Sequence, residues 1–348
     1  MLLSDYSYDL PEDLIAKYPP EVRGGSRLLV LDHKTGELKD SFYRDLPDFL
    51  RAGDVLVLNE TKVMSARLFM LDEQGKEHEL IVLENHGKTQ DMALYRGKLR
   101  MGDVLCLKKM QAQKVRVAEI LDGGIARVEV IRGDVMAKPE SENALNLAEL
   151  AAKYGEVPLP PYLKREAEES DLERYQTEFA KNLGSAAAPT ASLNLTREII
   201  QRAEAKGVKV AKLTLHVGLG TFLPIRTDDL TDHKMHSEYY EIPETTLRAI
   251  EDAKLNGGRV VAVGTTAARA LESFATSGEA RGETQIFIYP GYEFKLVDAL
   301  LTNFHAPKST VLMLAAAFAG WQNLKRAYEY AVAEKYALLS YGDSMLIV

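Results

Sequence analysis

The sequence contains very little cysteine, since Cys106 is the only one in 348 residues. A single thiol can form neither an intramolecular disulfide nor a thiolate-rich metal site. The chain also lacks an apolar run approaching the roughly 20 residues that a membrane-spanning helix needs. Its first residues contain neither the basic nor the apolar region of a signal peptide. Together these absences predict a cytoplasmic protein.

The chain has no excess of basic charge and no complete nucleotide-binding glycine motif. Its formal net charge of −8 argues against a protein that binds nucleic acid over its whole surface, but it allows a local basic patch. No third glycine follows Gly218 and Gly220 in register, so these glycines do not form a dinucleotide fingerprint. A phosphate-binding loop of the Gly-x-x-x-x-Gly-Lys-Ser/Thr type is also absent from the sequence.

The composition, 46% hydrophobic and 27% charged, is typical of a globular protein with a large core. At roughly 100–200 residues per domain, two domains are expected. Between residues 59 and 151, short strand-like runs separated by glycines predict a small antiparallel barrel or sandwich. From residue 192 onward, strands and helices alternate, which predicts a sheet covered by helices.

Capping residues and apolar runs locate individual elements of the α/β part. Thr196 fits the N-cap of a helix over 196–206, and Ser309 fits the N-cap of a helix over 310–319. The apolar run 285–289 predicts a strand.

The strand predicted over 208–217 delivers His216 to a glycine-rich exit. Glycine allows a ligand to approach the backbone closely, and His233, His236 and Glu238 follow shortly afterwards. Three of the histidines could bind zinc together with Glu238. General acid–base chemistry suits imidazole near neutral pH better, and the alternative is a buried histidine beside an ordinary loop.

Two further strand exits carry polar side chains. Gly264, Thr265 and Thr266 follow a strand and begin a helix, whose free N–H groups suit a carboxylate, phosphate or ribose oxygen. Alternatively, a threonine only caps this helix. Asn303 and His305 end the next predicted strand. Ligands of open sheets collect at the carboxyl ends of strands, where these groups are expected.

The segment 93–117 is locally basic. It has seven Lys and Arg residues and one acidic residue, a local charge of +6. In an acidic protein this predicts a phosphate-contacting surface, and the alternative is a solvated barrel face. The candidate phosphate-contacting residues are Arg96, Lys98, Arg100, Lys108 and Lys109.

Many motifs in one order resemble the S-adenosylmethionine:tRNA ribosyltransferase-isomerase family of queuosine biosynthesis. They include Asn-Glu-Thr-Lys at 59–62, Tyr-Gln-Thr at 175–177, Ala-Ala-Pro-Thr at 187–190, the segments 213–222 and 233–238, Gly-Thr-Thr at 264–266 with Arg269 and Glu272, Asn-Phe-His at 303–305 and Ser-Tyr-Gly-Asp at 340–343. The resemblance covers nearly the whole chain. It implies an α/β domain at 1–58 and 152–348 that carries an inserted small antiparallel β-barrel domain at 59–151.

The resemblance also implies the reaction. The ribosyl group of S-adenosylmethionine, the donor substrate, is transferred and isomerised onto 7-aminomethyl-7-deazaguanine at the wobble position of tRNA. Epoxyqueuosine forms, and adenine and methionine are released. A sulfonium acidifies the adjacent C5′ hydrogen, so a positioned base can start the reaction. Methionine's carboxylate suits the helix N-terminus at Thr265 and Thr266. No metal is expected, and the protein is predicted to be a monomer.

The expected catalytic residues are His216, His236, His305 and Glu238. Proton transfer is assigned to His216 or His236, whereas Asn303 and His305 orient the substrate. The expected substrate-binding residues are Arg67, Gln176, Pro189, Thr190, Gly218, Gly220, Thr221, Thr265, Thr266, Arg269, Asn303, Tyr341 and Asp343.

Apart from the segment 182–186, where Asn-Leu-Gly-Ser-Ala replaces the usual Asn-Pro-Gly-Ala-Val, the chain departs from the family pattern at two places. Asn194 stands where the family usually has histidine, and Ala337, Leu338 and Leu339 replace an arginine and two phenylalanines. An amide cannot titrate near pH 7 as imidazole does, and lost rings weaken base stacking. Two alternatives therefore stand beside the enzyme: a tRNA-binding homologue with impaired or lost catalysis, and a metal-dependent hydrolase on a similar scaffold.

Overall fold

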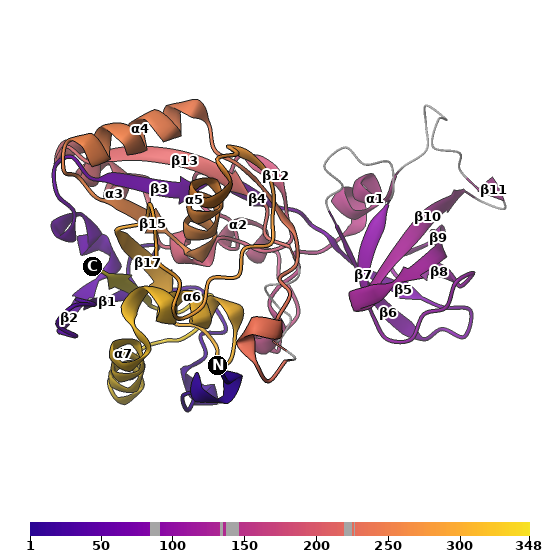
Figure 1. Cartoon of the computed structure of the whole chain (residues 1–348). Helices are drawn as coiled ribbons and strands as arrows, with labels where there is room; N and C mark the ends of the chain where they lie inside the picture. The colour runs from indigo at the N-terminus through magenta and orange to yellow at the C-terminus, as the bar shows by residue number, and fades with distance from the viewer. Residues whose placement is uncertain (84–90, 133–134, 137–145, 219–224, 226) are drawn as a thin grey trace.

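A large mixed sheet and a separate antiparallel sheet organise the computed structural model, which describes residues 1–83, 91–132, 135–136, 146–218, 225 and 227–348 (Figure 1). The large sheet has the strand order β16 (Arg281–Thr284), β14 (Glu238–Glu241), β13 (Lys209–Leu215), β3 (Val55–Asn59), β15 (Val260–Val263), β17 (Ala299–Asn303), β18 (Ser344–Ile347), β1 (Arg27–Leu31) and β2 (Leu38–Phe42).

The four strands β13, β3, β15 and β17 at the centre of this sheet are parallel. Every residue of β3, β15 and β17 is buried. Strands covered on both faces need apolar side chains on both faces, which explains their continuous Val, Leu and Ala runs. Their carboxyl ends therefore meet at one edge of the sheet.

Helices cover both faces of the large sheet, as the alternation of elements predicts. The helices of the chain are α1 (Leu147–Tyr154), α2 (Asp171–Arg174), α3 (Arg197–Ala205), α4 (Glu244–Leu255), α5 (Thr265–Ser277), α6 (Thr310–Ala319) and α7 (Trp321–Ala333). One face packs against α4, α5, α6 and α7, and the other packs against α3. Both predicted caps are confirmed: Ile199 N donates to Thr196 Oγ1 at 3.3 Å and Leu312 N to Ser309 Oγ at 3.2 Å.

The strand predicted over 285–289 is wrong. The strand of this region is β16, which ends at Thr284 and pairs antiparallel with β14. Ile286, Phe287 and Ile288 follow it as irregular backbone and line a small cavity together with Val311 and Leu314 of α6. The run is apolar because it packs against a helix, and its composition alone resembles that of a buried strand.

The second sheet is antiparallel and has its own core, separate from the α/β body in Figure 1. Its order is β11 (Val135–Met136), β10 (Ile125–Arg132), β7 (Met92–Arg96), β6 (Glu77–Val82), β5 (Arg67–Leu71), β8 (Val104–Leu107) and β9 (Met110–Leu121). Because β10 also pairs with β9, six of these strands are hydrogen-bonded in a ring. Residues Leu68, Leu105 and Val115 fill its interior, and α1 adds Leu147 and Leu150.

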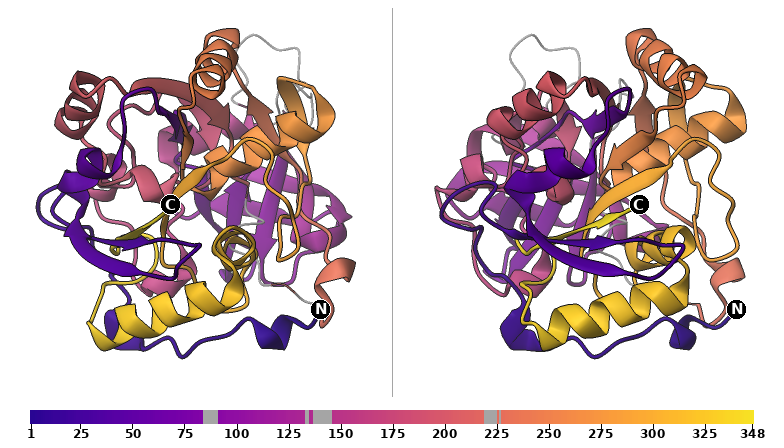
Figure 2. Two further views of the ribbon diagram at one scale, coloured as in Figure 1. Left: turned by 60° about the vertical axis from the view of Figure 1, so that its left-hand side comes forward. Right: turned by 90° about the vertical axis from the view of Figure 1, so that its left-hand side faces the viewer.

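A two-stranded parallel sheet of β4 (Thr61–Val63) and β12 (Asn182–Ser185) lies where the chain leaves the large sheet. The amino-terminal segment runs along the helical side of the α/β body, beside α7 (Figure 2). Tyr6 packs on Trp321 and Tyr8 packs edge-on against Tyr328. Within the part of the chain that the structure describes, every helix is too short or too polar to cross a bilayer.

Candidate active site

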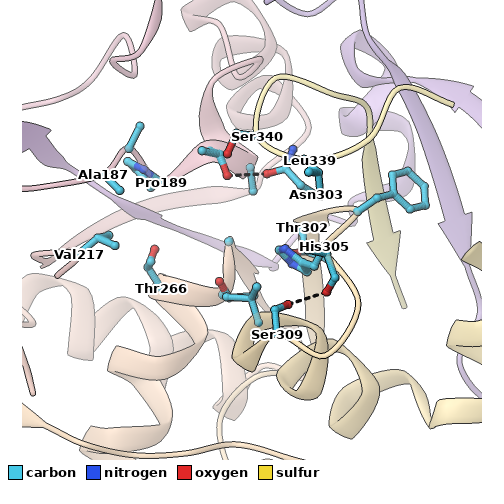
Figure 3. A pocket seen from close by; sticks show the side chains of 18 of the residues that line it. Ala187, Pro189, Val217, Thr266, Thr302, Asn303, His305, Ser309, Leu339 and Ser340 are labelled. Carbon is cyan, nitrogen blue, oxygen red and sulfur yellow. Dashed lines mark hydrogen bonds between the residues drawn. The ribbon is translucent and has the colours of Figure 1, made fainter. Parts of the chain in front are cut away.

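A cavity lies at the carboxyl ends of β15 and β17, on the sheet edge that the sequence predicts for a ligand (Figure 3). It encloses about 740 Å³, open solvent at its mouth included. Six of the expected site residues line it: Pro189, Thr190, Thr265, Thr266, Asn303 and His305.

Thr190 and Asn303 are hydrogen-bonded to each other although 113 positions separate them in the sequence. Asn303 is the last residue of β17 and is buried, and its Oδ1 accepts a hydrogen bond from Thr190 Oγ1 at 2.8 Å. The run 186–189 of small residues brings the backbone close to this strand end. This contact fixes the orientation of the Asn303 amide at the pocket wall.

His305 contributes an imidazole to the pocket; one hydrogen bond holds the ring and two more hold the backbone of this residue. Its Nε2 lies 2.7 Å from Thr302 Oγ1, its backbone N–H donates to the Tyr328 hydroxyl, and its carbonyl accepts from Tyr8. Burial lowers the pKa of His305 to about 3, so the ring is neutral at pH 7. Nδ1 makes no hydrogen bond with a described residue and is therefore available to a ligand.

The first turn of α5 forms another wall of the pocket. Its N-cap is Gly264, with φ of +92°, and no side chain caps the helix. The alternative that a threonine only caps this helix is therefore wrong. Thr266 Oγ1 instead accepts a hydrogen bond from Asn59 Nδ2 at 3.1 Å. Within the described part of the chain, the first-turn N–H groups thus lack a side-chain cap, as an anion-binding helix end requires.

His216 and His236 lie outside the main pocket. Val217 lines it, whereas the preceding His216 faces the other side of the chain and places Nδ1 2.8 Å from Thr61 Oγ1. His236 is exposed. The expected Gly220 and Thr221 lie outside the described residues.

Gly218, Glu238 and Arg269 form a buried cluster beside α5. Glu238 Oε1 accepts a hydrogen bond from Gly218 N at 2.9 Å, and Oε2 pairs with Arg269 Nη1. Both charged side chains are almost fully buried. The structure thus joins three predicted residues, at the side of α5 rather than in the main pocket.

Several expected binding residues make structural contacts outside the main pocket. Gln176 bonds through its amide to both backbone groups of Val63. Tyr341 donates to Asp171 at 2.8 Å, and Asp343 accepts from the backbone N–H groups of Arg27 and Ala337. Arg67 pairs with Glu79 at 2.9 Å and lines a different cavity. These contacts fix loops and strand ends, and none of these four side chains lines the main pocket.

Tyr175 lines the main pocket and was not predicted as a site residue. Its ring is fully buried, and its hydroxyl has no hydrogen-bond partner among the described residues. Burial, reinforced by Tyr162 and Tyr341, raises its pKa well above the ordinary value, although the Ala188 backbone acts in the opposite direction. The hydroxyl therefore stays protonated and can donate to a ligand. The sequence places Tyr175 in a motif, but gives no sign that its hydroxyl lacks a partner.

The five candidate phosphate-contacting residues of the segment 93–117 are all exposed. Three are paired with carboxylates: Arg96 with Glu79, Lys108 with Glu77 and Lys109 with Glu156. Among the described residues, Lys98 and Arg100 have no acidic partner. Of these five side chains, Lys98 and Arg100 are therefore the two whose charge no described carboxylate neutralises.

The two departures from the family pattern differ in their relation to the pocket. Asn194 is buried and does not line it, whereas Leu339 does. The described residues include no group of three histidine, cysteine, aspartate or glutamate side chains arranged to hold a metal ion.

Comparisons with known proteins extend over the whole chain. Residues 3–347 match the family described as "Queuosine biosynthesis protein". A protein of Chlorobaculum parvum named S-adenosylmethionine:tRNA ribosyltransferase-isomerase is 52% identical, and a namesake from Francisella philomiragia is 43% identical, each over 100% of both chains. A crystal structure of S-adenosylmethionine tRNA ribosyltransferase from Thermotoga maritima is 33% identical, with a TM-score of 0.56, covering 99% of this chain and 100% of that one.

Proposed function

This chain belongs to the queuosine biosynthesis family, and on that premise we propose that it is an S-adenosylmethionine:tRNA ribosyltransferase-isomerase. It transfers and isomerises the ribosyl group of S-adenosylmethionine onto 7-aminomethyl-7-deazaguanine at the wobble position of tRNA. Epoxyqueuosine is formed, and adenine and methionine are released. The observation that carries the proposal is the full-length relationship to enzymes of this name.

The main pocket is proposed to hold the adenosyl part of S-adenosylmethionine. Its wall combines apolar side chains with hydroxyl, amide and imidazole groups, as ligand pockets typically do. Thr190 and Asn303 offer groups with a fixed orientation for ribose hydroxyls. The positive end of the helix dipole at the uncapped first turn of α5 favours the negatively charged α-carboxylate of the methionine part nearby.

The chemistry requires removal of a proton from C5′, which the sulfonium acidifies, and a donor for the departing adenine. Among the described residues, His305 is the imidazole that lines the pocket. Its lowered pKa keeps the ring neutral and makes it a weak base at pH 7, so its proposed part is to accept a hydrogen bond at Nδ1 and orient the substrate. Tyr175 keeps its proton and suits the donor role. His216, His236 and Glu238 remain proposed catalytic residues, and from their positions they would have to act from outside this pocket.

The domain division is also part of the proposal. We interpret the ring of six antiparallel strands as a small β-barrel within an inserted domain at 59–151, and residues 1–58 with 152–348 as the catalytic domain. The exposed basic side chains of the inserted domain are proposed to contact tRNA phosphates. The protein is proposed to be a cytoplasmic monomer.

The test is a chromatographic assay for free adenine. The protein is incubated with S-adenosylmethionine and tRNA carrying the aminomethyl precursor, and unmodified tRNA is the control. Adenine released only with the modified tRNA is the expected result, and it would show that Asn194 is compatible with turnover. Folded protein that binds this tRNA without releasing adenine would instead identify a binding homologue that has lost catalysis.

A further inference from the structure

A second, smaller cavity lies on the other side of the first turn of α5. Thr265, Thr266 and Val311 line both this cavity and the main pocket, so the two are adjacent. The smaller cavity encloses about 390 Å³, open solvent included, and is walled by apolar side chains that include Met235, Phe287 and Leu314. Its one charged lining residue among the described residues is Arg269.

The guanidinium of Arg269 is incompletely paired although Arg269 is only 7% exposed. Nη1 pairs with Glu238, whereas Nε and Nη2 have no hydrogen-bond partner among the described residues. A buried donor that is left unpaired typically costs roughly 1–3 kcal/mol, and more when it is charged. A ligand that accepts from both nitrogens would remove this penalty.

The two unpaired nitrogens form one edge of the guanidinium. The N–H of Nε and one N–H of Nη2 point in parallel, at the spacing of the two oxygens of a carboxylate. Glu238 holds Nη1 and is itself held by Gly218 N, so this edge has a fixed position. The site is therefore preorganised for a single planar anion.

We propose that Arg269 binds the α-carboxylate of the methionine part of S-adenosylmethionine in this smaller cavity. This inference rests on the proposed function. The apolar walls suit the aliphatic chain and sulfur of the ligand, and the adjacent main pocket receives its adenosyl part. The α-ammonium group balances the charge of the added carboxylate, and the sulfonium, the remaining charge of the ligand, lies toward the main pocket between the methionine and adenosyl parts.

The test compares binding of S-adenosylmethionine with that of its decarboxylated analogue by calorimetry on the full chain. The wild-type protein should bind S-adenosylmethionine roughly tenfold to a hundredfold more tightly, because the analogue leaves both nitrogens unpaired. Equal affinities would overturn the inference. If neither ligand binds to the folded protein, the proposed function itself fails.

The variant Arg269→Lys keeps a cation for Glu238 but removes the planar edge. It should bind the two ligands with affinities within about threefold of each other, and a variant that keeps the wild-type preference would overturn the inference. Arg259→Lys is the matched control. The Arg259 side chain donates hydrogen bonds to Asp54 and to Phe49 O, and it lines neither cavity. This control should keep the wild-type preference. If Arg269→Lys does not fold, the comparison of ligands on the wild-type protein decides alone.

Discussion

Gly184 lies directly against the imidazole of His216: a Cβ atom added to Gly184 would stand 2.7 Å from Cε1 of that ring. Real Cβ atoms do not approach so closely, so any side chain at 184 must displace His216. The same ring is held on another side by Thr61 at 2.8 Å. Glycine at 184 is therefore a condition for the observed position of His216.

The substitution Gly184→Ala should destabilise the protein by about 1–3 kcal/mol, the range for overpacking. Urea unfolding of the wild type, both single variants and Gly184→Ala/His216→Ala measures the coupling. Because His216→Ala removes the ring that the new methyl group meets, the double variant should be more stable than the sum of the single changes predicts. Strict additivity would show that the two residues do not constrain each other.

The same variants test the proposed chemistry of His216. If His216 is the base, His216→Ala should lose adenine release by at least about a hundredfold, the lower end of the range for general-base catalysis. Full turnover by a folded His216→Ala protein would assign proton transfer to another group, and His236 is the alternative that the sequence offers.

Tyr175→Phe should leave stability unchanged or slightly raised, because the hydroxyl that it removes is buried without a partner. It should nevertheless slow adenine release, since the pocket loses a donor. Tyr240→Phe is the control. The Tyr240 hydroxyl donates to Glu279 O at 2.7 Å, so its removal should lower stability by roughly 1 kcal/mol and leave turnover unchanged. A Tyr175→Phe protein that is destabilised but fully active would contradict the assignment.

Stability should decrease below pH 6.5 because of His305. Its pKa is about 3 in the folded chain, against 6.5 for an unperturbed histidine. Between these values the unfolded state binds a proton that the folded state does not, so this contribution is complete above pH 6.5 and is lost as the pH falls. The loss from pH 6.5 to pH 5 should be about 1–2 kcal/mol. Urea unfolding of the wild type and of His305→Gln at several pH values isolates this contribution to the unfolding free energy. If the unfolding free energies of the two proteins changed in parallel with pH, burial would not suppress the protonation of His305.

The sequence predicts the elements of the α/β part well, because apolar periodicity and capping are local. Thr196 and Ser309 cap their helices as expected. Composition cannot distinguish a buried strand from irregular backbone packed on a helix, which explains the error at 285–289. The position of the pocket was also predictable, since parallel strands bring their carboxyl ends to one edge.

The role of each motif residue could not be predicted from the sequence. Thr190 and Asn303 line the pocket. Gln176 and Tyr341 come from equally distinctive motifs, but Gln176 bonds to the Val63 backbone and Tyr341 donates to the buried Asp171. Both roles demand a particular polar side chain at a particular position. The difference depends on contacts between segments more than 100 residues apart, which local patterns do not encode.

Glu272 illustrates a motif residue with a structural role. It is fully buried and accepts hydrogen bonds from the Tyr292 hydroxyl and from the backbone N–H groups of Lys295, Leu296 and Val297. Glu272→Ala leaves these donors unpaired and should lower the unfolding free energy by roughly 3 kcal/mol or more. Thermal unfolding would measure the loss, and a near-native midpoint would show that the loop finds other acceptors.

The basic surface of the second sheet should bind tRNA chiefly through its unpaired cations. Lys98 and Arg100 are exposed and have no acidic partner among the described residues, whereas Lys108 and Lys109 are neutralised by Glu77 and Glu156. A phosphate can recruit a paired lysine only by displacing its carboxylate. Charge removal at 98 and 100 should therefore weaken binding more than removal at 108 and 109.

The measurement is tRNA affinity as a function of salt concentration for the double variants Lys98→Gln/Arg100→Gln and Lys108→Gln/Lys109→Gln. Each phosphate contact contributes close to one unit to the slope of log affinity against log salt. The first variant should lower the slope by about two units and the second by less than one. Equal slopes for both variants would mean that tRNA displaces the carboxylate partners, and an unchanged slope for the first would place the tRNA on another face of the molecule.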